Sequence, residues 1–70
     1  MKIPVVVEKT PTGYSAYSPD VDGCVAAGSS LDEVEQLMRE AVAFHFEGLK
    51  AEGLTVPEPQ SHVLYIEVAA

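Results

Sequence analysis

Basic residues are the class that this sequence most clearly lacks. The 70-residue chain has 4 Lys and Arg against 11 Asp and Glu, which gives a formal net charge of −7. Proteins that contact nucleic acid directly need clustered Lys and Arg to displace phosphate counterions. Here the four basic residues are scattered, at Lys2, Lys9, Arg39 and Lys50. We therefore expect no direct binding of DNA or RNA. A basic protein partner suits the charge, although an acidic surface more often only keeps a protein soluble.

Cysteine is almost absent as well. Cys24 is the single cysteine, so no disulfide can form within the chain, and the distant His45 and His62 do not complete a zinc-binding pattern. A chain this short buries only about 60% of its unfolded surface. Its core is therefore marginal, and the 47% hydrophobic content favours self-association as the additional source of stability.

Signals for export or membrane insertion are also missing. The N-terminus carries one lysine before an apolar run that ends at Glu8, unlike a signal peptide. No stretch approaches the roughly 20 apolar residues of a membrane span. These absences, with the unpaired cysteine, predict a cytoplasmic protein, and the length predicts one domain, residues 1–70.

Four segments have the pattern of β-strands. Residues 1–8 are predicted to form the first strand, with Ile3, Val5 and Val7 on one face and Pro4 and Val6 on the other. Pro4 is typical of an edge strand or a strand start. The turn residues 10–13 lead into a second strand over 14–18, and a short third strand follows over 24–27. The alternation over 62–68 predicts a final strand.

Between the third and last strands, residues 30–52 predict one long helix. Ser30 and Glu33 fit a capping box, in which the Ser30 hydroxyl accepts from the Glu33 N–H and the Glu33 side chain reaches back to the Ser30 N–H. Apolar residues then recur at helical spacing. Gly53 is suited to end the helix, with Leu54 against Leu49. The predicted fold is therefore α+β, in the order β-β-β-α-β.

A single helix covers only one face of a sheet, so the other face is expected to carry exposed apolar and aromatic residues. Val6 and Tyr17, with Val63 and Tyr65 of the last strand, are candidates for this uncovered face. Phe44 and Phe46 lie about 100° to either side of His45 on the helix, so one of them is expected to contact a neighbouring subunit. The candidate interface residues are Val6, Tyr17, Tyr65, Phe44 and Phe46.

No residue is predicted to be catalytic or to bind a metal or cofactor. Asp20, Asp22 and Glu33 could together hold Mg²⁺ for a minimal nuclease, but each has a local explanation, as a turn former or a helix cap. Cys24 is expected to be a small buried strand residue, and His45 a packed histidine with one hydrogen-bond partner.

The segment from Tyr14 to Val34, with its Pro19-Asp20 pair, Gly23-Cys24 pair and Ser30-Leu31-Asp32-Glu33 helix start, resembles the HicB antitoxin family. Residues 39–49 also look like the family's helix. The resemblance implies a partly degraded ribonuclease-H-like fold and the antitoxin half of a toxin–antitoxin pair, commonly dimeric or tetrameric. It also implies a partner, the HicA toxin, a small basic RNA-cleaving protein whose active site the antitoxin masks. Family members usually carry a C-terminal DNA-binding domain, which this chain, ending at Ala70, is expected to lack.

Together these observations predict a non-enzymatic protein-binding module of the HicB type, which self-associates and masks a HicA-type toxin or another basic protein. Two alternatives stay open. One is the minimal metal-dependent nuclease described above, and the other is a stand-alone regulator with a different protein partner.

Overall fold

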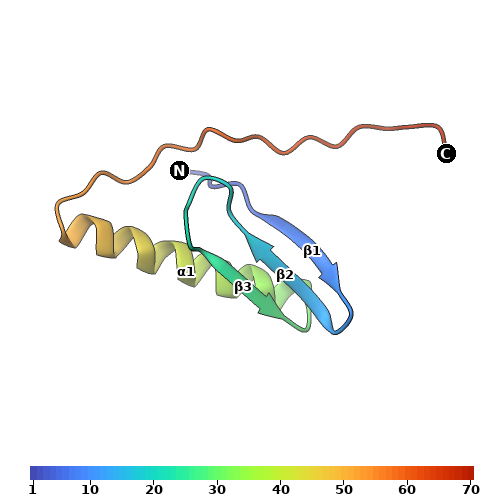
Figure 1. The fold of residues 1–70 in the computed structure, drawn as a ribbon, viewed down its shortest axis with the longest axis horizontal. Helices are drawn as coiled ribbons and strands as arrows, with labels where there is room; N and C mark the ends of the chain where they lie inside the picture. Colours follow the sequence, from blue (N-terminus) through green and yellow to red (C-terminus); the bar gives the residue numbers. More distant parts are fainter.

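The computed structural model describes all residues, 1–70. Three antiparallel strands form one sheet in the order β1-β2-β3, and one long helix lies against it (Figure 1). The α+β class is therefore confirmed. The elements are β1 (Val6–Thr10), β2 (Gly13–Tyr17), β3 (Val25–Gly28) and α1 (Leu31–Ala51).

Strands β1 and β2 form a tight hairpin. Thr10 pairs with Gly13, so only Pro11 and Thr12 separate the strands, and the ladder ends where Val6 pairs with Tyr17. The expected first strand, residues 1–8, is therefore displaced toward the turn. Residues 1–5 have no ladder partner because β2 ends opposite Val6.

The connection from β2 to β3 is a compact loop. The Ser18 N–H donates to the Cys24 carbonyl at 3.4 Å, and the Asp20 N–H donates to Ser18 Oγ at 3.3 Å. Gly23 has a φ of 78°, in the left-handed region that favours glycine. This geometry turns the chain so that β3 begins at Val25 rather than at Cys24.

Both ends of α1 follow the expected capping chemistry. Ser30 is the N-cap, and its hydroxyl accepts from the Glu33 N–H at 3.1 Å. At the other end the Leu54 N–H donates to the Leu49 carbonyl at 2.8 Å, and Gly53 has a φ of 74°, as in a Schellman stop. One detail differs. The Glu33 carboxylate accepts from the N–H of Ser29, at 3.0 Å, and not from Ser30. It reaches one residue further because Gly28 has no side chain in its path.

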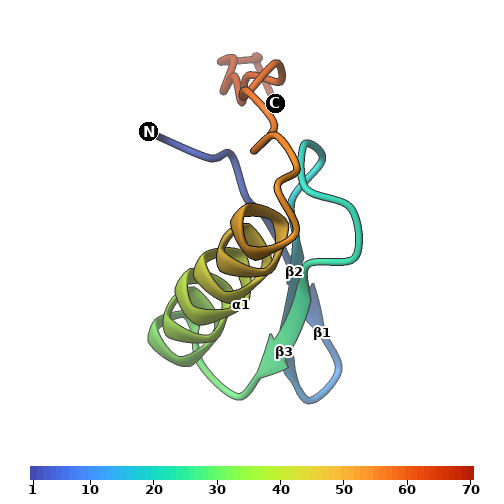
Figure 2. The same ribbon diagram turned by 90° about the vertical axis from the view of Figure 1, so that its left-hand side faces the viewer.

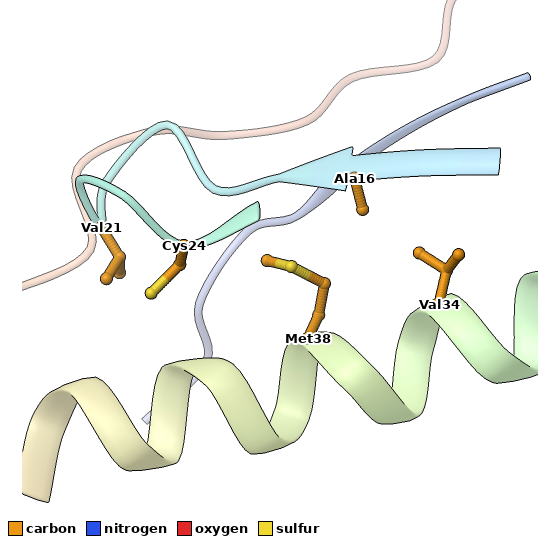
Figure 3. Close-up of a cluster of buried hydrophobic side chains, with 5 residues drawn as sticks. All are labelled: Ala16, Val21, Cys24, Val34 and Met38. Atoms are coloured by element: carbon orange, nitrogen blue, oxygen red, sulfur yellow. The ribbon is translucent and has the colours of Figure 1, made fainter. Parts of the chain in front are cut away.

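The core lies between α1 and one face of the sheet (Figure 3). The helix packs against β3 and β2 only, so β1 extends beyond the helix. Val7 illustrates this position: it pairs with the buried Ala16 and so faces the helix side, yet it is 41% exposed. The five buried hydrophobic residues are Ala16, Val21, Cys24, Val34 and Met38.

The expected last strand, residues 62–68, is not formed. Residues 62–70, which we call the C-terminal arm, are extended and exposed, and no ladder pairs them with the sheet. In Figures 1 and 2 the arm leaves the body and follows neither edge of the sheet. Alternating apolar residues fit a strand, but a strand also needs a partner, and the arm's attachment at Asp20, described below, holds it away from its own sheet.

The arm gives the chain an elongated shape. The molecule measures 49 × 26 × 16 Å and has a radius of gyration of 13.9 Å, whereas a compact domain of this length is expected near 11 Å. No helix here has both the length and the hydropathy that a membrane span needs.

Candidate functional site

The sheet face opposite the helix, which we call the open face, carries a row of apolar side chains. Val6 pairs with Tyr17, and Tyr17 pairs with Val25, so the three residues lie side by side across the three strands. Opposite residues of antiparallel neighbours point to the same face. Tyr17 is 42% exposed and Val25 is 68% exposed. The open face therefore presents an aromatic ring between two β-branched side chains, with no other element over it (Figure 2).

Beside the helix lies an apolar groove, which we call the β1 groove because it adjoins the segment that leads into β1. It has a volume of about 540 Å³. It lies between the segment preceding β1, which contributes Met1 and Ile3, and the helix, which contributes Met38, Val42 and Phe46. No residue of the three strands lines it.

A second groove, of about 420 Å³, lies beside the β2–β3 loop. Cys24, Phe44 and His45 are among its lining residues. Phe44 is 78% exposed, whereas Phe46 packs against the core. The two rings point to different sides of the helix, as their spacing requires. His45 is half-buried beside Phe46, with ring centroids 6.4 Å apart, but it makes no hydrogen bond within the chain. The expected single partner is thus absent, because the imidazole lines an open groove.

Asp20 anchors the root of the C-terminal arm. Its carboxylate accepts three hydrogen bonds, from the backbone N–H groups of Gln60 and Ser61, at 3.1 and 3.0 Å, and from Ser61 Oγ at 2.8 Å. The bond from the Ser61 N–H is the main cause that holds the pKa of Asp20 below its usual value, since donors stabilise the ionised carboxylate. Burial acts in the opposite direction but is outweighed. Sequence reasoning assigned Asp20 to a turn, with a magnesium ligand as the alternative, and no local signal could reveal a partner 40 residues away.

The remaining candidates for chemistry, except Asp22, have structural contacts. Cys24 is buried, its Sγ lies 3.8 Å from the Ala41 carbonyl, and burial raises the pKa of its thiol. A raised pKa disfavours the reactive thiolate. Glu33 accepts from Ser29, and Asp20 is occupied by the arm. No three His, Cys, Asp or Glu side chains gather where a metal ion could be held.

The structure brings together only part of the predicted interface. Val6 and Tyr17 are neighbours on the open face, and Val25 joins them although it was not predicted. Tyr65 is 95% exposed on the arm, so the expectation that Tyr65 and Val63 lie on the sheet is wrong for a single chain. Phe44 faces solvent elsewhere and Phe46 turns inward.

The acidic chain folds as a small sheet with one helix and exposes apolar side chains, so it is a small α+β domain with surfaces suited to contact another protein. The comparisons with known proteins agree and give the family. The family described as "HicB_like antitoxin of bacterial toxin-antitoxin system" matches residues 3–68. The chain belongs to this family of HicB-like antitoxins.

Two curated relatives and one solved structure show how widely the match extends. The chain is 34% identical to a UPF0150 protein of Helicobacter pylori, over 99% of this chain and 97% of that protein. It is 36% identical to an uncharacterized 14.9 kDa protein of Haemophilus phage HP1, over 94% of this chain but only 50% of the phage protein. This chain thus spans half of the phage relative and nearly all of the other. A chain in a structure of a HicA3 and HicB3 toxin–antitoxin complex is 37% identical, with a TM-score of 0.69, covering 84% of this chain and 70% of that one.

Proposed function

We propose that this chain is an antitoxin domain that binds a small basic RNA-cleaving toxin of the HicA type and masks its active site. The observation that carries this proposal is the 37% identity and the TM-score of 0.69 to a chain of a HicA3 and HicB3 toxin–antitoxin complex. In this role the chain acts in the cytoplasm by binding alone, with no catalytic residue, metal or cofactor.

The charge distribution supports a basic partner. Helix α1 carries five acidic and two basic residues, and its solvent-facing side is largely acidic. Arg39 pairs with Glu35 at 3.1 Å, which removes one charge of each sign, so the helix keeps its excess of three negative charges (five acidic minus two basic). An acidic surface of this kind attracts a basic protein and repels nucleic acid, which is why we propose no direct binding of DNA or RNA.

The test is inhibition of a purified HicA-type toxin by this chain. RNA cleavage by the toxin is measured as the chain is titrated in. We expect inhibition to be complete near a fixed stoichiometric ratio, as tight masking of an active site requires. Undiminished cleavage at a large molar excess of the folded chain would overturn the proposal.

The same samples separate the alternatives. The nuclease alternative requires cleavage of RNA by this chain alone in the presence of millimolar Mg²⁺, with loss of cleavage in Asp22→Asn. The alternative of a regulator with another protein partner requires a folded chain that leaves the basic toxin active while binding a different protein stoichiometrically.

We also propose self-association through the open face. Val6, Tyr17 and Val25 form the central row of that interface, and Phe44 is a separate candidate contact on the helix. The change Tyr17→Ser is expected to lower the mass measured by light scattering, because aromatic residues at the centre of an interface contribute strongly to binding. An unchanged mass would remove Tyr17 from the interface.

A further inference from the structure

The C-terminal arm combines apolar side chains with an unpaired backbone. Leu64, Tyr65 and Ile66 are 83%, 95% and 81% exposed, and Val68 is 73% exposed. No backbone hydrogen bond joins residues 62–70 to the rest of the chain. Extended apolar segments in this state are ready to pair with a free sheet edge.

The alternation within the arm has two sides. Leu64, Ile66 and Val68 lie on one side of an extended chain, and Val63, Tyr65 and Glu67 lie on the other. Nine extended residues span about 30 Å at roughly 3.3 Å per residue. This length exceeds that of β1, which has five residues. The arm can therefore cover the whole edge of β1 of a second molecule.

The β1 groove adjoins the segment that leads into β1, through Met1 and Ile3, and no residue of β1 itself lines it. A strand that pairs with the free edge of β1 and continues past Val6 along the preceding segment would bring its alternate side chains to the groove, which is lined mostly by apolar residues such as Ile3, Val42 and Phe46. It would also cover Val7, which faces the helix side but is 41% exposed. The edge of β3 offers less, because that strand has four residues and the helix already packs against it.

Asp20 decides which molecule receives the arm. Its three hydrogen bonds fix Gln60 and Ser61 beside the β2–β3 loop, and from this point the arm leaves the body along neither edge of its own sheet (Figures 1 and 2). A second copy of the chain presents the same edge without this constraint. Two copies related by a two-fold axis can exchange arms reciprocally, which closes the assembly.

We propose that two copies of this chain exchange their C-terminal arms, each arm forming a fourth strand beside β1 of the other copy and filling its β1 groove. Leu64, Ile66 and Val68 enter the groove, and Tyr65 joins the row of Val6, Tyr17 and Val25 on the open face. The inference rests on the proposed self-association and specifies its element and its edge. Open-face contacts would then join two exchanged dimers into a tetramer.

Cross-linking between two different chains tests the exchange. Both chains carry Cys24→Ala, which removes the buried thiol. One chain is tagged and carries Ile66→Cys in the arm, and the other is untagged and carries Val7→Cys on β1. After mixing, a short bis-maleimide is expected to produce a covalent dimer of one tagged and one untagged chain. Replacing Val7→Cys by Glu47→Cys, on the exposed side of the helix, is the control and should produce little.

A chain carrying both cysteines distinguishes exchange from folding back. A cross-link found only within single chains, with none in the mixture, overturns the exchange, because the arm then pairs with its own sheet. The absence of any cross-link between the arm and residue 7 also overturns it.

The mass of arm variants provides a second measurement. The double variant Leu64→Asp, Ile66→Asp is expected to halve the mass of the oligomer measured by light scattering. Its circular dichroism should remain that of the folded chain, because both side chains are exposed in the monomer. Tyr17→Ser, by contrast, should leave the exchanged dimer intact. An unchanged mass in the arm variant would overturn the exchange. Toxin inhibition is measured separately, so a chain that exchanges arms but leaves the toxin active would overturn only the masking function.

Discussion

Asp20 makes hydrogen bonds far beyond the turn in which it lies. A carboxylate in a turn commonly accepts from its own neighbours, but this one accepts from Gln60 and Ser61, 40 and 41 residues further along the chain. The contact ties the β2–β3 loop to the root of the arm. Because the interaction is with an ionised carboxylate, its strength depends on pH.

The depressed pKa of Asp20 predicts that the arm's root loosens in acid. Above the ordinary pKa of Asp, about 3.9, the carboxylate is ionised in both folded and unfolded states and its contribution is complete. As pH falls below that value the unfolded state is protonated first, and the contribution is lost progressively until pH passes below the folded pKa. Hydrogen exchange at Gln60 and Ser61, measured relative to their intrinsic rates, should therefore lose protection progressively as the pH falls below about 4.

The variant Asp20→Ala should remove this protection at all pH values. Asp22→Ala is the control, because Asp22 lies in the same loop and makes no hydrogen bond through its side chain. Equal protection of the Gln60 and Ser61 amides in wild type and Asp20→Ala would contradict the anchoring role.

Val34 and Val25 are the same residue type at a buried and an exposed position, so together they test how much burial contributes to stability. Val34 is 0% exposed beneath the sheet (Figure 3), and Val25 is 68% exposed on the open face. Val34→Ala removes two buried methyl groups and should lower the free energy of unfolding by about 2 kcal/mol. Val25→Ala should cost less than half as much. Denaturant titration at one fixed protein concentration measures both, and equal losses would show that Val25 is as well packed as Val34.

At the scale of the element, α1 is specified by its two ends. Ser30 begins it by accepting from Glu33, and Gly53 ends it with the bond from Leu54 to Leu49. The helix is long for so small a domain, with 21 residues, and a helix of this length needs both stops to keep its register on the sheet. The sequence contains both signals, which is why its boundaries were predicted within one residue.

Removing the N-cap hydrogen bond is expected to lower the stability of the fold measurably. Ser30→Ala removes the hydroxyl that accepts from Glu33 and should lower stability by about 1 kcal/mol. Ser29→Ala is the control, because Ser29 takes part through its backbone N–H alone. Thermal unfolding of the two variants should separate them by several degrees, and coincident melting curves would contradict the cap's contribution.

The strands contrast with the helix at this scale. A strand's pattern specifies which residues share a face, and the pairing of Val6 with Tyr17 follows from it. It does not specify the neighbour. The segment 62–68 has the alternation of a strand and yet no partner in the single chain, because pairing depends on where the preceding segment is held.

At the scale of the whole molecule, the net charge of −7 predicts the kinetics of partner binding. Charges steer association over about a Debye length, roughly 8 Å at physiological salt, and such steering raises association rates by 10-fold or more. The association rate with the basic toxin should therefore fall at least about tenfold between low and high salt, with a smaller change in the dissociation rate.

Stopped-flow or surface-binding kinetics over a salt series measure this effect. Glu40→Gln with Glu47→Gln, both exposed on α1, should flatten the salt dependence, whereas Lys2→Gln should not. An association rate that is independent of salt would show that the acidic surface serves solubility and not recognition.

The sequence by itself determined the α+β class, the helix with both of its caps, the family resemblance and the open face with Val6 and Tyr17. These features depend on periodicity and on contacts within a few residues, which a chain carries in its order. Only the tertiary structure decided that Val25 joins the open face, that Phe46 turns inward while Phe44 stays exposed, and that the last segment lies free. Each of these features depends on contacts between segments that are far apart in the sequence. For the arm, the deciding contact is that of Asp20 with Gln60 and Ser61, which no local sequence pattern encodes.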